Sequence, residues 1–336
     1  MYKRQQLRYI SHYPDATNDD ILNAIADIYG MNKNQIVVGN GAAELLYAIC
    51  RLPGYTGAFV PAPGFSEYKA ALEASRIPVR DIYYRPREDE HGKPYFEVPY
   101  LALETFAAEL KGQDGRIIVF LGNPNNPDGT LLDKNHIRTI ASMLKDANSL
   151  LVIDESFIDF VGNDTLQDNE YSMRSLVNEF DNIIVVHSFT KFYAVPGLRI
   201  GAAFSNPLII EQLNSFIPTW SVNTLAQSYT EAALNDVEYV KRTKQVLHEE
   251  QLFMYNSLDT IDGITIYPPS ANFMLFHIEQ EGITAESINE ALKKYNMIVR
   301  NCDSYMGLNN QWVRVAIKDH DTNVKLVEKL TDILKV

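Results

Sequence analysis

The stretch IIVVHSFTKFYAVPGLRIG, residues 183–201, decides the fold. It opens with a short, continuous apolar run and continues with polar residues, a lysine, a Pro-Gly turn and an arginine. A run of this kind is typical of a strand that is buried on both faces of a sheet. Lys191 and Arg199 follow the strand, eight residues apart. Because ligands of open α/β sheets bind at the carboxyl ends of the strands, we expect both cations at a binding edge.

Four similar apolar runs come before this stretch, and helical patterns separate them. Short apolar runs that alternate with helices are what a parallel sheet covered on both faces requires. We therefore predict an α/β fold for roughly residues 31–220, with a doubly wound, mostly parallel sheet. The runs are Ile36–Val38, Ala58–Val60, Ile117–Leu121 and Leu150–Ile153.

The two ends of the chain have different patterns. A helix is predicted over Asn18–Tyr29, with Thr17 or Asn18 as its cap and Gly30 at its end. Residues 221–336 are predicted to form a smaller α+β domain. Its elements are expected over Thr224–Leu234, Val237–Leu258, Ala271–Phe276, Ala285–Lys294, Trp312–Ile317 and from Asn323 onward.

The composition excludes several classes of protein. The 336 residues include 30 Lys and Arg against 43 Asp and Glu, a formal net charge of −13, which argues against general binding to nucleic acid or to an anionic membrane. No apolar run approaches a membrane span and residues 1–13 hold no signal-peptide core, so we expect a cytoplasmic protein. The cysteines, Cys50 and Cys302, and the histidines show no metal-ligand spacing, so we predict no metal site.

Polar residues also follow the earlier strands. Residues 39–44, Gly-Asn-Gly-Ala-Ala-Glu, form a glycine turn that opens a helix and presents free backbone N–H groups to an anion. Residues 122–129 contain two Asn-Pro pairs, which hold an asparagine side chain toward the strand ends. Asp154 follows the next strand, and a carboxylate buried there needs a cationic partner or hydrogen-bond donors.

Together the strand ends supply a phosphate cradle, an amide, a buried carboxylate, an amine and a guanidinium. Pyridoxal 5′-phosphate uses this whole set. Its aldehyde forms an imine with a lysine, and its pyridine nitrogen needs a carboxylate to stay protonated. Its phosphate needs N–H groups, a hydroxyl and an arginine. The combination predicts that this cofactor binds at the sheet edge.

These motifs resemble those of the fold-type I pyridoxal-phosphate enzymes of the class I and II aminotransferase family, in the branch that contains histidinol-phosphate aminotransferase. The resemblance runs from about Tyr13 to the C-terminus and implies the aspartate aminotransferase-like fold. It implies that Lys191 is the Schiff-base lysine, Asp154 the pyridinium partner and Asn126 the donor to the phenolic oxygen of the cofactor. For the rest of the cofactor site it implies ring stacking by Phe65 and phosphate contacts from Ser188, Arg199 and the backbone of Ala42 and Ala43.

The resemblance also implies an oligomer. Tyr13, in His-Tyr-Pro-Asp, matches a tyrosine that reaches the phosphate bound by the neighbouring subunit, which implies a homodimer with shared active sites. Residues 1–30 are then expected to pack against the small domain and the dimer mate. The family has a substrate-contacting arm upstream of this motif, whereas this chain starts twelve residues before Tyr13. We therefore expect either a truncated start or a more open substrate site.

Within the branch, three stretches resemble the threonine-phosphate decarboxylases of cobalamin synthesis more closely than the aminotransferases. They are residues 190–199, 218–223 and 299–314. Arg314 matches an arginine that binds the substrate α-carboxylate, and Arg300 beside it suits a small phosphorylated amino acid or amine with two anionic ends. The activity implied is decarboxylation of L-threonine O-3-phosphate.

The residues themselves leave two alternatives open. The bond at the substrate Cα that lies perpendicular to the cofactor ring is the one that breaks, and the sequence does not contain that torsion. If the Cα–H bond is perpendicular, Lys191 moves the proton and transamination of the histidinol-phosphate type follows. A non-catalytic binding protein is the other alternative, against which the intact Lys191, Asp154 and Arg199 argue.

Overall fold

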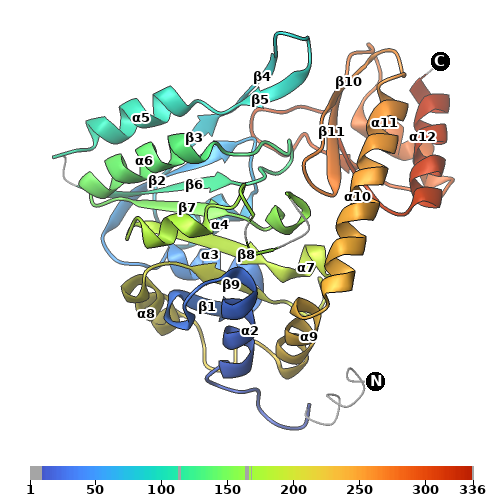
Figure 1. Cartoon of the computed structure of the whole chain (residues 1–336). Coiled ribbons are helices and arrows are strands. Elements are labelled where there is room, and N and C mark those ends of the chain that lie inside the picture. Colours follow the sequence, from blue (N-terminus) through green and yellow to red (C-terminus); the bar gives the residue numbers. More distant parts are fainter. Residues whose placement is uncertain (1–9, 113–114, 163–165, 168, 335–336) are drawn as a thin grey trace.

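The computed structural model describes residues 10–112, 115–162, 166–167 and 169–334. It contains a large and a small sheet, each covered by helices (Figure 1). The large sheet has seven strands in the order β1-β9-β8-β7-β6-β2-β3. Their bounds are β1 Ile36–Gly39, β2 Tyr55–Ala62, β3 Val79–Tyr83, β6 Arg116–Gly122, β7 Leu150–Asp154, β8 Ile183–Ser188 and β9 Gly201–Phe204.

The sheet confirms the predicted α/β fold with a mostly parallel sheet, and all five apolar runs form strands. Strands β3 and β9 of this sheet were not predicted from the sequence. Strand β9 is antiparallel to both of its neighbours, β1 and β8. Its register places Gly201 opposite Gly39 on one side and Ser188 on the other, so the start of β9 lies at the edge where β1 and β8 end.

The continuous apolar runs arise because each strand packs on both faces. In β7, Leu151 and Ile153 belong to one core cluster, whereas Leu150 and Val152 belong to another on the opposite face. The first cluster includes residues of α2 (Asp19–Tyr29), α5 (Tyr100–Glu109), α6 (Lys134–Asp146) and α9 (Thr224–Leu234). The second includes residues of α3 (Gly41–Ile49), α4 (Glu67–Ala74) and α8 (Pro207–Phe216).

Helix α2 begins at Asp19, so Asn18 has the predicted cap position, but the expected side-chain cap is not formed. Asn18 has a left-handed backbone and its side chain makes no capping hydrogen bond. The Asp15 carboxylate instead accepts hydrogen bonds from the backbone N–H groups of Thr17 and Asp19, both at 3.0 Å. Gly30 ends the helix in the left-handed conformation, as predicted.

The small sheet is antiparallel, in the order β10-β11-β13-β12. Strands β10 and β12 were not predicted, and α12 begins at His320 rather than Asn323. Asp319 explains the earlier start, because its carboxylate accepts a hydrogen bond from the backbone N–H of Thr322. The bounds are β10 Ile264–Tyr267, β11 Phe273–Ile278, β12 Arg300–Asn301, β13 Trp312–Ala316, α10 Val237–Leu258, α11 Ala285–Lys293 and α12 His320–Leu334.

The remaining elements are short. They are the hairpin β4 (Arg85–Glu88) and β5 (Pro94–Glu97), the helix α7 (Phe189–Phe192) and the 3-10 turns η2 (Lys33–Gln35), η3 (Ile158–Phe160) and η4 (Arg174–Asn178). None of the helices in the described part of the chain combines the length and apolar character that crossing a bilayer requires. The division of the chain into an N-terminal segment, a large domain and a small domain, with boundaries after residues 30 and 220, stays a prediction. Residues 1–9 of the N-terminal segment lie outside the described ranges.

Candidate active site

A pocket of about 990 Å³ contains three of the sequence-predicted site residues, Lys191, Arg300 and Arg314. Lys191 lies on α7, which directly follows β8 of the large sheet. Arg300 and Arg314 lie on the neighbouring strands β12 and β13 of the small sheet. The pocket therefore joins the binding edge of the large sheet to the small one.

Lys191 lies in a largely desolvated position. Its Nζ donates a hydrogen bond of 3.1 Å to Ser188 Oγ and lies 5.4 Å from the centre of the Phe157 ring. Burial lowers the pKa of Lys191, and the Asp154 carboxylate opposes part of that effect. The lower pKa makes a neutral amine available at a lower pH than for an exposed lysine.

Asp154 ends β7 and is buried at 6% exposure. Its Oδ2 accepts a hydrogen bond of 2.8 Å from the Tyr68 hydroxyl, and its Oδ1 accepts one of 2.9 Å from the Ser156 backbone N–H. Burial, together with the nearby Asp154 charge, raises the pKa of Tyr68 well above its usual value. Tyr68 therefore stays protonated and fixes the orientation of the carboxylate.

The predicted phosphate site brings two distant motifs into contact. A Cβ added to Gly41, at the first position of α3, would lie 2.4 Å from Arg199 Nη2, so the guanidinium packs directly on the glycine. The Asn40 cap side chain makes no hydrogen bond to the first turn of α3, where Ala42 and Ala43 lie. The helix start thus presents N–H donors beside a guanidinium, which suits an anion.

Asn126 lies between the two sheets. Its Oδ1 accepts a hydrogen bond from the Arg314 guanidinium and another, of 3.2 Å, from the Tyr305 hydroxyl. Arg314 also lies 5.2 Å from the centre of the Phe273 ring. The Asn-Pro loop and the predicted carboxylate-binding arginine are therefore held together.

Phe65 and Tyr13 have contrasting surroundings. Phe65 is partly buried and meets the Tyr68 ring edge-on, with the ring centres 5.7 Å apart. Tyr13 is 78% exposed and stacks on Trp220 at 4.5 Å, so in one chain it belongs to the surface rather than to the pocket. Its predicted role requires a second copy of the chain.

Three contacts in or near the pocket were missed by sequence reasoning. Tyr68 and Tyr305 hydrogen-bond to Asp154 and Asn126, respectively, and Lys318 lines the pocket. No local signal marks the two tyrosines, because their partners are distant in sequence. For Lys318 the sequence does contain a signal. It lies four residues after Arg314, and because side chains alternate along an extended chain, both are placed on the same face.

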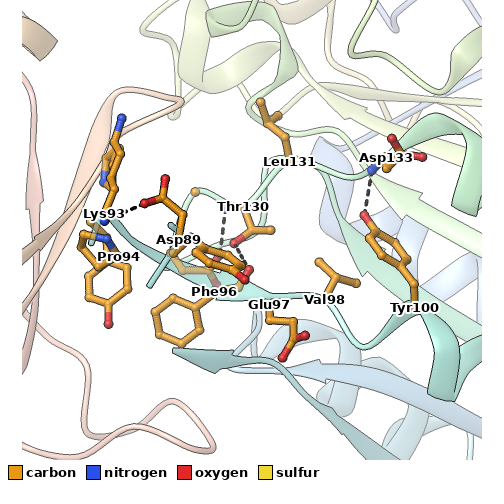
Figure 2. A pocket seen from close by; sticks show the side chains of 15 residues that line it. Asp89, Lys93, Pro94, Phe96, Glu97, Val98, Tyr100, Thr130, Leu131 and Asp133 are labelled. Carbon is orange, nitrogen blue, oxygen red and sulfur yellow. Dashed lines mark hydrogen bonds between the residues drawn. The ribbon is translucent and has the colours of Figure 1, made fainter. Parts of the chain in front are cut away.

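A separate cavity of about 690 Å³ lies beside the β4–β5 hairpin (Figure 2). Its lining includes Asp89 and Lys93 of the hairpin turn, Asp128 of the Asn-Pro loop and Tyr267 of β10. Figure 2 shows the Asp89 carboxylate bonded to the Lys93 backbone N–H, at 2.9 Å. The lining holds none of the predicted site residues, so the candidate site is the pocket that contains Lys191.

No three His, Cys, Asp or Glu side chains gather as metal ligands within residues 10–112, 115–162, 166–167 and 169–334. Both cysteines are buried. The chemistry available in the pocket is therefore that of an amine, guanidinium groups, an amide and a nearby buried carboxylate. Such a set can bind anions, carry a proton on the amine and hold a cationic ring nitrogen against the carboxylate.

Comparison with known proteins identifies relatives along nearly the whole chain. The model of the family "Aminotransferase class I and II" matches residues 3–330. A putative threonine-phosphate decarboxylase of Caldanaerobacter subterraneus is 30% identical over 321 residues, which cover 96% of this chain and 83% of the relative. A histidinol-phosphate aminotransferase of Methanosphaera stadtmanae is 28% identical over 97% of this chain and 83% of its own length.

A longer relative shares the same region. The adenosylcobalamin biosynthesis bifunctional protein CobDQ of Leptospira interrogans is 32% identical over 96% of this chain, and the chain spans 35% of that protein.

Solved structures of both kinds have the same fold. The histidinol-phosphate aminotransferase of Clostridium acetobutylicum superposes with a TM-score of 0.86 at 25% identity, over 98% of this chain and 92% of the other. The L-threonine-O-3-phosphate decarboxylase of Porphyromonas gingivalis superposes with a TM-score of 0.82 at 24% identity, over 100% and 94%.

Proposed function

Because the chain belongs to the aminotransferase class I and II family, whose members are pyridoxal-phosphate enzymes, we propose that it decarboxylates L-threonine O-3-phosphate. The product is (R)-1-aminopropan-2-yl phosphate, for cobalamin synthesis. The observation that carries the proposal is the pocket that Lys191 shares with Arg300 and Arg314. One lysine and two arginines suit a small substrate with an amino group and two anionic ends.

The cofactor is pyridoxal 5′-phosphate, and the donor set of this chain fits its parts. When bound, it draws electron density away from the substrate Cα. The tight packing of Arg199 on Gly41 and the uncapped first turn of α3 support a phosphate site there. The residues that would hold the cofactor are Ala42, Ala43, Ser188 and Arg199 at the phosphate, Asp154, Asn126 and Phe65 at the ring, and Lys191 at the aldehyde.

Gly41→Ala is expected to weaken cofactor binding by about 10- to 100-fold, the value of a hydrogen bond to a charged group. The new Cβ would lie 2.4 Å from Arg199 Nη2 and displace the guanidinium, and the φ of +80° disfavours any side chain. Equilibrium dialysis of pyridoxal phosphate measures the effect. Gly197→Ala is the matched control, since its Cβ would meet nothing within 4 Å. Equal affinity of both variants would place the phosphate elsewhere.

Lys191 acts on the substrate through its amine. Its lowered pKa favours the neutral form, which can bond to the cofactor aldehyde and later carry a proton. In decarboxylation the bond from Cα to the carboxylate breaks, the electron pair stays at Cα, and CO2 leaves. A proton from Lys191 or from water then takes the place of the carboxylate.

Asp154 acts at the ring nitrogen of the cofactor. Its carboxylate is oriented by Tyr68 and by the Ser156 backbone N–H, and a fixed charge of this kind costs no reorganisation during the reaction. It holds the nitrogen protonated, which sustains the withdrawal of electrons from Cα.

Transamination of the histidinol-phosphate type is the alternative. The Methanosphaera relative and the Clostridium structure favour it. Arg314 counts against decarboxylation, because an arginine bound to the substrate carboxylate stabilises the ground state from which CO2 must leave. In that reaction Lys191 removes the proton from Cα, and the amino group passes to an acceptor such as 2-oxoglutarate.

A homodimer completes the proposed site. Tyr13 from the partner subunit would donate its hydroxyl to the cofactor phosphate. Its 78% exposure in the single chain and its stacking on the half-exposed Trp220 support this arrangement, because both rings are free for an interface.

The reaction is tested with two substrates. The cofactor-loaded protein is mixed with O-phospho-L-threonine and, separately, with histidinol phosphate plus 2-oxoglutarate, while CO2 and glutamate are followed together. We expect CO2 from the first mixture and no glutamate from the second. Glutamate without CO2 would replace the proposal with the aminotransferase. If neither CO2 nor glutamate forms in either mixture, both activities are refuted for this chain.

A further inference from the structure

We propose that Lys318 is a third substrate-binding cation and that the pocket selects ligands that carry a carboxylate and a phosphate on one molecule. This inference deepens the proposed function, on whose site it rests, by defining the substrate class. Lys318 lines the same pocket as Lys191, Arg300 and Arg314.

Strand alternation brings Lys318 to the pocket. Along β13 and the residues that follow it, Val313, Val315 and Ile317 are buried in the core of the small sheet. The intervening residues point to the other face, and all three of them, Arg314, Ala316 and Lys318, line the pocket. The small alanine between the two cations leaves room over the strand.

Arg300 adds a third positive charge to this face. It lies directly opposite Arg314 in the register of β12 and β13. Like charges directly opposite each other destabilise a sheet, so the arrangement requires compensation.

The described residues provide little of that compensation. The polar side-chain partners of Arg300 and Arg314 are neutral, namely Ser304 for the former and Asn126 and Tyr305 for the latter. Within the described ranges, Arg300, Arg314 and Lys318 form no ion pair, although the charge of Lys318 contributes to the lowered pKa of its neighbour Asp319, which is not among the pocket-lining residues. The pocket lining contains one carboxylate, Asp303, against these three cations and Lys191. In a chain whose net charge is −13, such an excess of cations is expected to serve an anionic ligand.

The three positive charges of Arg300, Arg314 and Lys318 indicate how much negative charge the ligand carries. A carboxylate and a phosphate monoester together carry a charge of about −3 near neutral pH, which three cations balance. Arg314 is partly buried and bonded to Asn126, so it takes the carboxylate nearest the reacting centre. Arg300 and Lys318 are both exposed residues of the pocket lining, and we assign the phosphate to them. A phosphorylated amine without a carboxylate leaves Arg314 unpaired.

Binding of an unreactive probe tests this assignment apart from turnover. 3-Phosphoglycerate has a hydroxyl where phosphoserine has an amine, so it carries both anions and cannot react. Calorimetric titration of the holoenzyme should show that it binds about 10-fold or more tightly than glycerate or glycerol 3-phosphate. Lys318→Met should weaken 3-phosphoglycerate and glycerol 3-phosphate by about 10-fold, leave glycerate unchanged, and be rescued by Lys318→Arg.

Lys325→Met is the matched control, since Lys325 is exposed on α12 outside the pocket and its replacement removes the same charge. Unchanged binding of 3-phosphoglycerate to Lys318→Met, or an equal loss in Lys325→Met, would overturn the inference. So would failure of the wild-type holoenzyme to bind 3-phosphoglycerate more tightly than the two single-anion probes. If the probes behave as expected but O-phosphothreonine releases no CO2, the decarboxylase proposal fails and the binding inference stands.

Discussion

Lys191→Ala is expected to lower kcat by about 10⁴-fold or more, the largest effect of any single substitution in this chain. The variant loses both the amine that bonds to the cofactor aldehyde and the group that carries the proton at Cα. Removal of the largely desolvated amine leaves its neighbours with other partners: Ser188 Oγ meets Thr190 Oγ1 at 2.8 Å, and Asp154 keeps its hydrogen bonds from Tyr68 and the Ser156 N–H. Stopped assays of CO2 and glutamate give the rates, and thermal unfolding shows that the fold persists.

A second readout separates chemistry from turnover. Borohydride reduces a lysine–cofactor link and fixes the cofactor to the chain, so peptide mass spectrometry should find the label at Lys191 in the wild type. Lys191→Ala should carry no label, whereas Lys325→Ala should be labelled like the wild type. A label on another lysine would refute the assignment of Lys191.

Asp154→Asn should lower kcat by about 10²- to 10³-fold, the cost of losing one fixed electrostatic group in an active site. Asparagine has the shape of aspartate but only one acceptor oxygen. That oxygen can keep the bond from the Ser156 N–H while the new NH2 group donates to the Tyr68 oxygen, so the orientation of the side chain is retained. Only the charge opposite the ring nitrogen is lost. Steady-state kinetics of the cofactor-saturated variant measure the loss.

Tyr68→Phe separates the charge of Asp154 from its orientation. The variant keeps the carboxylate and its bond to the Ser156 backbone N–H but removes the hydroxyl donor. We expect a loss of about 10-fold, smaller than that of Asp154→Asn. A kcat for Asp154→Asn within about threefold of the wild type would exclude the proposed role of the carboxylate.

The part of the fold that the sequence predicts is the part with strong local patterns. The five apolar runs are strands because their residues are buried on both faces, which leaves no polar position within them. Strand β9 was missed because Gly-Ala-Ala-Phe has low strand propensity and is short; its neighbours in the sheet, not its own residues, make it a strand. Asn18 has the predicted cap position of α2 but makes no capping bond with its side chain, whereas the carboxylate of Asp15 accepts a hydrogen bond from the first backbone N–H of the helix.

The residues of the candidate site likewise fall into those that local patterns predict and those that they do not. Lys191, Asp154 and Asn126 follow strands or strand-end loops, so the rule that parallel strands end at one edge was enough to group them. Tyr68 and Tyr305 depend on how α4 and the loop after β12 pack, which no periodicity reveals. Lys318 was within reach of the sequence, since the alternation that makes Arg314 face outward applies to it equally.

The register of β9 also determines how the positions of Lys191 and Arg199 would respond to insertions or to a shift in strand pairing. Gly201 pairs with Ser188, so residues 189–200 leave and return to the sheet at the same point, and the chain there is a closed loop. Lys191 and Arg199 lie near the two ends of that loop. An insertion within it would disturb both side chains, because Phe192 and Tyr193 are buried and the backbone carbonyls of Phe192 and Leu198 accept hydrogen bonds from Tyr239 and Asn223. A one-residue slip of β9 would shift the guanidinium and leave the amine in place. A constant length is therefore expected both between Lys191 and Arg199 and in the pairing of β9 with β8.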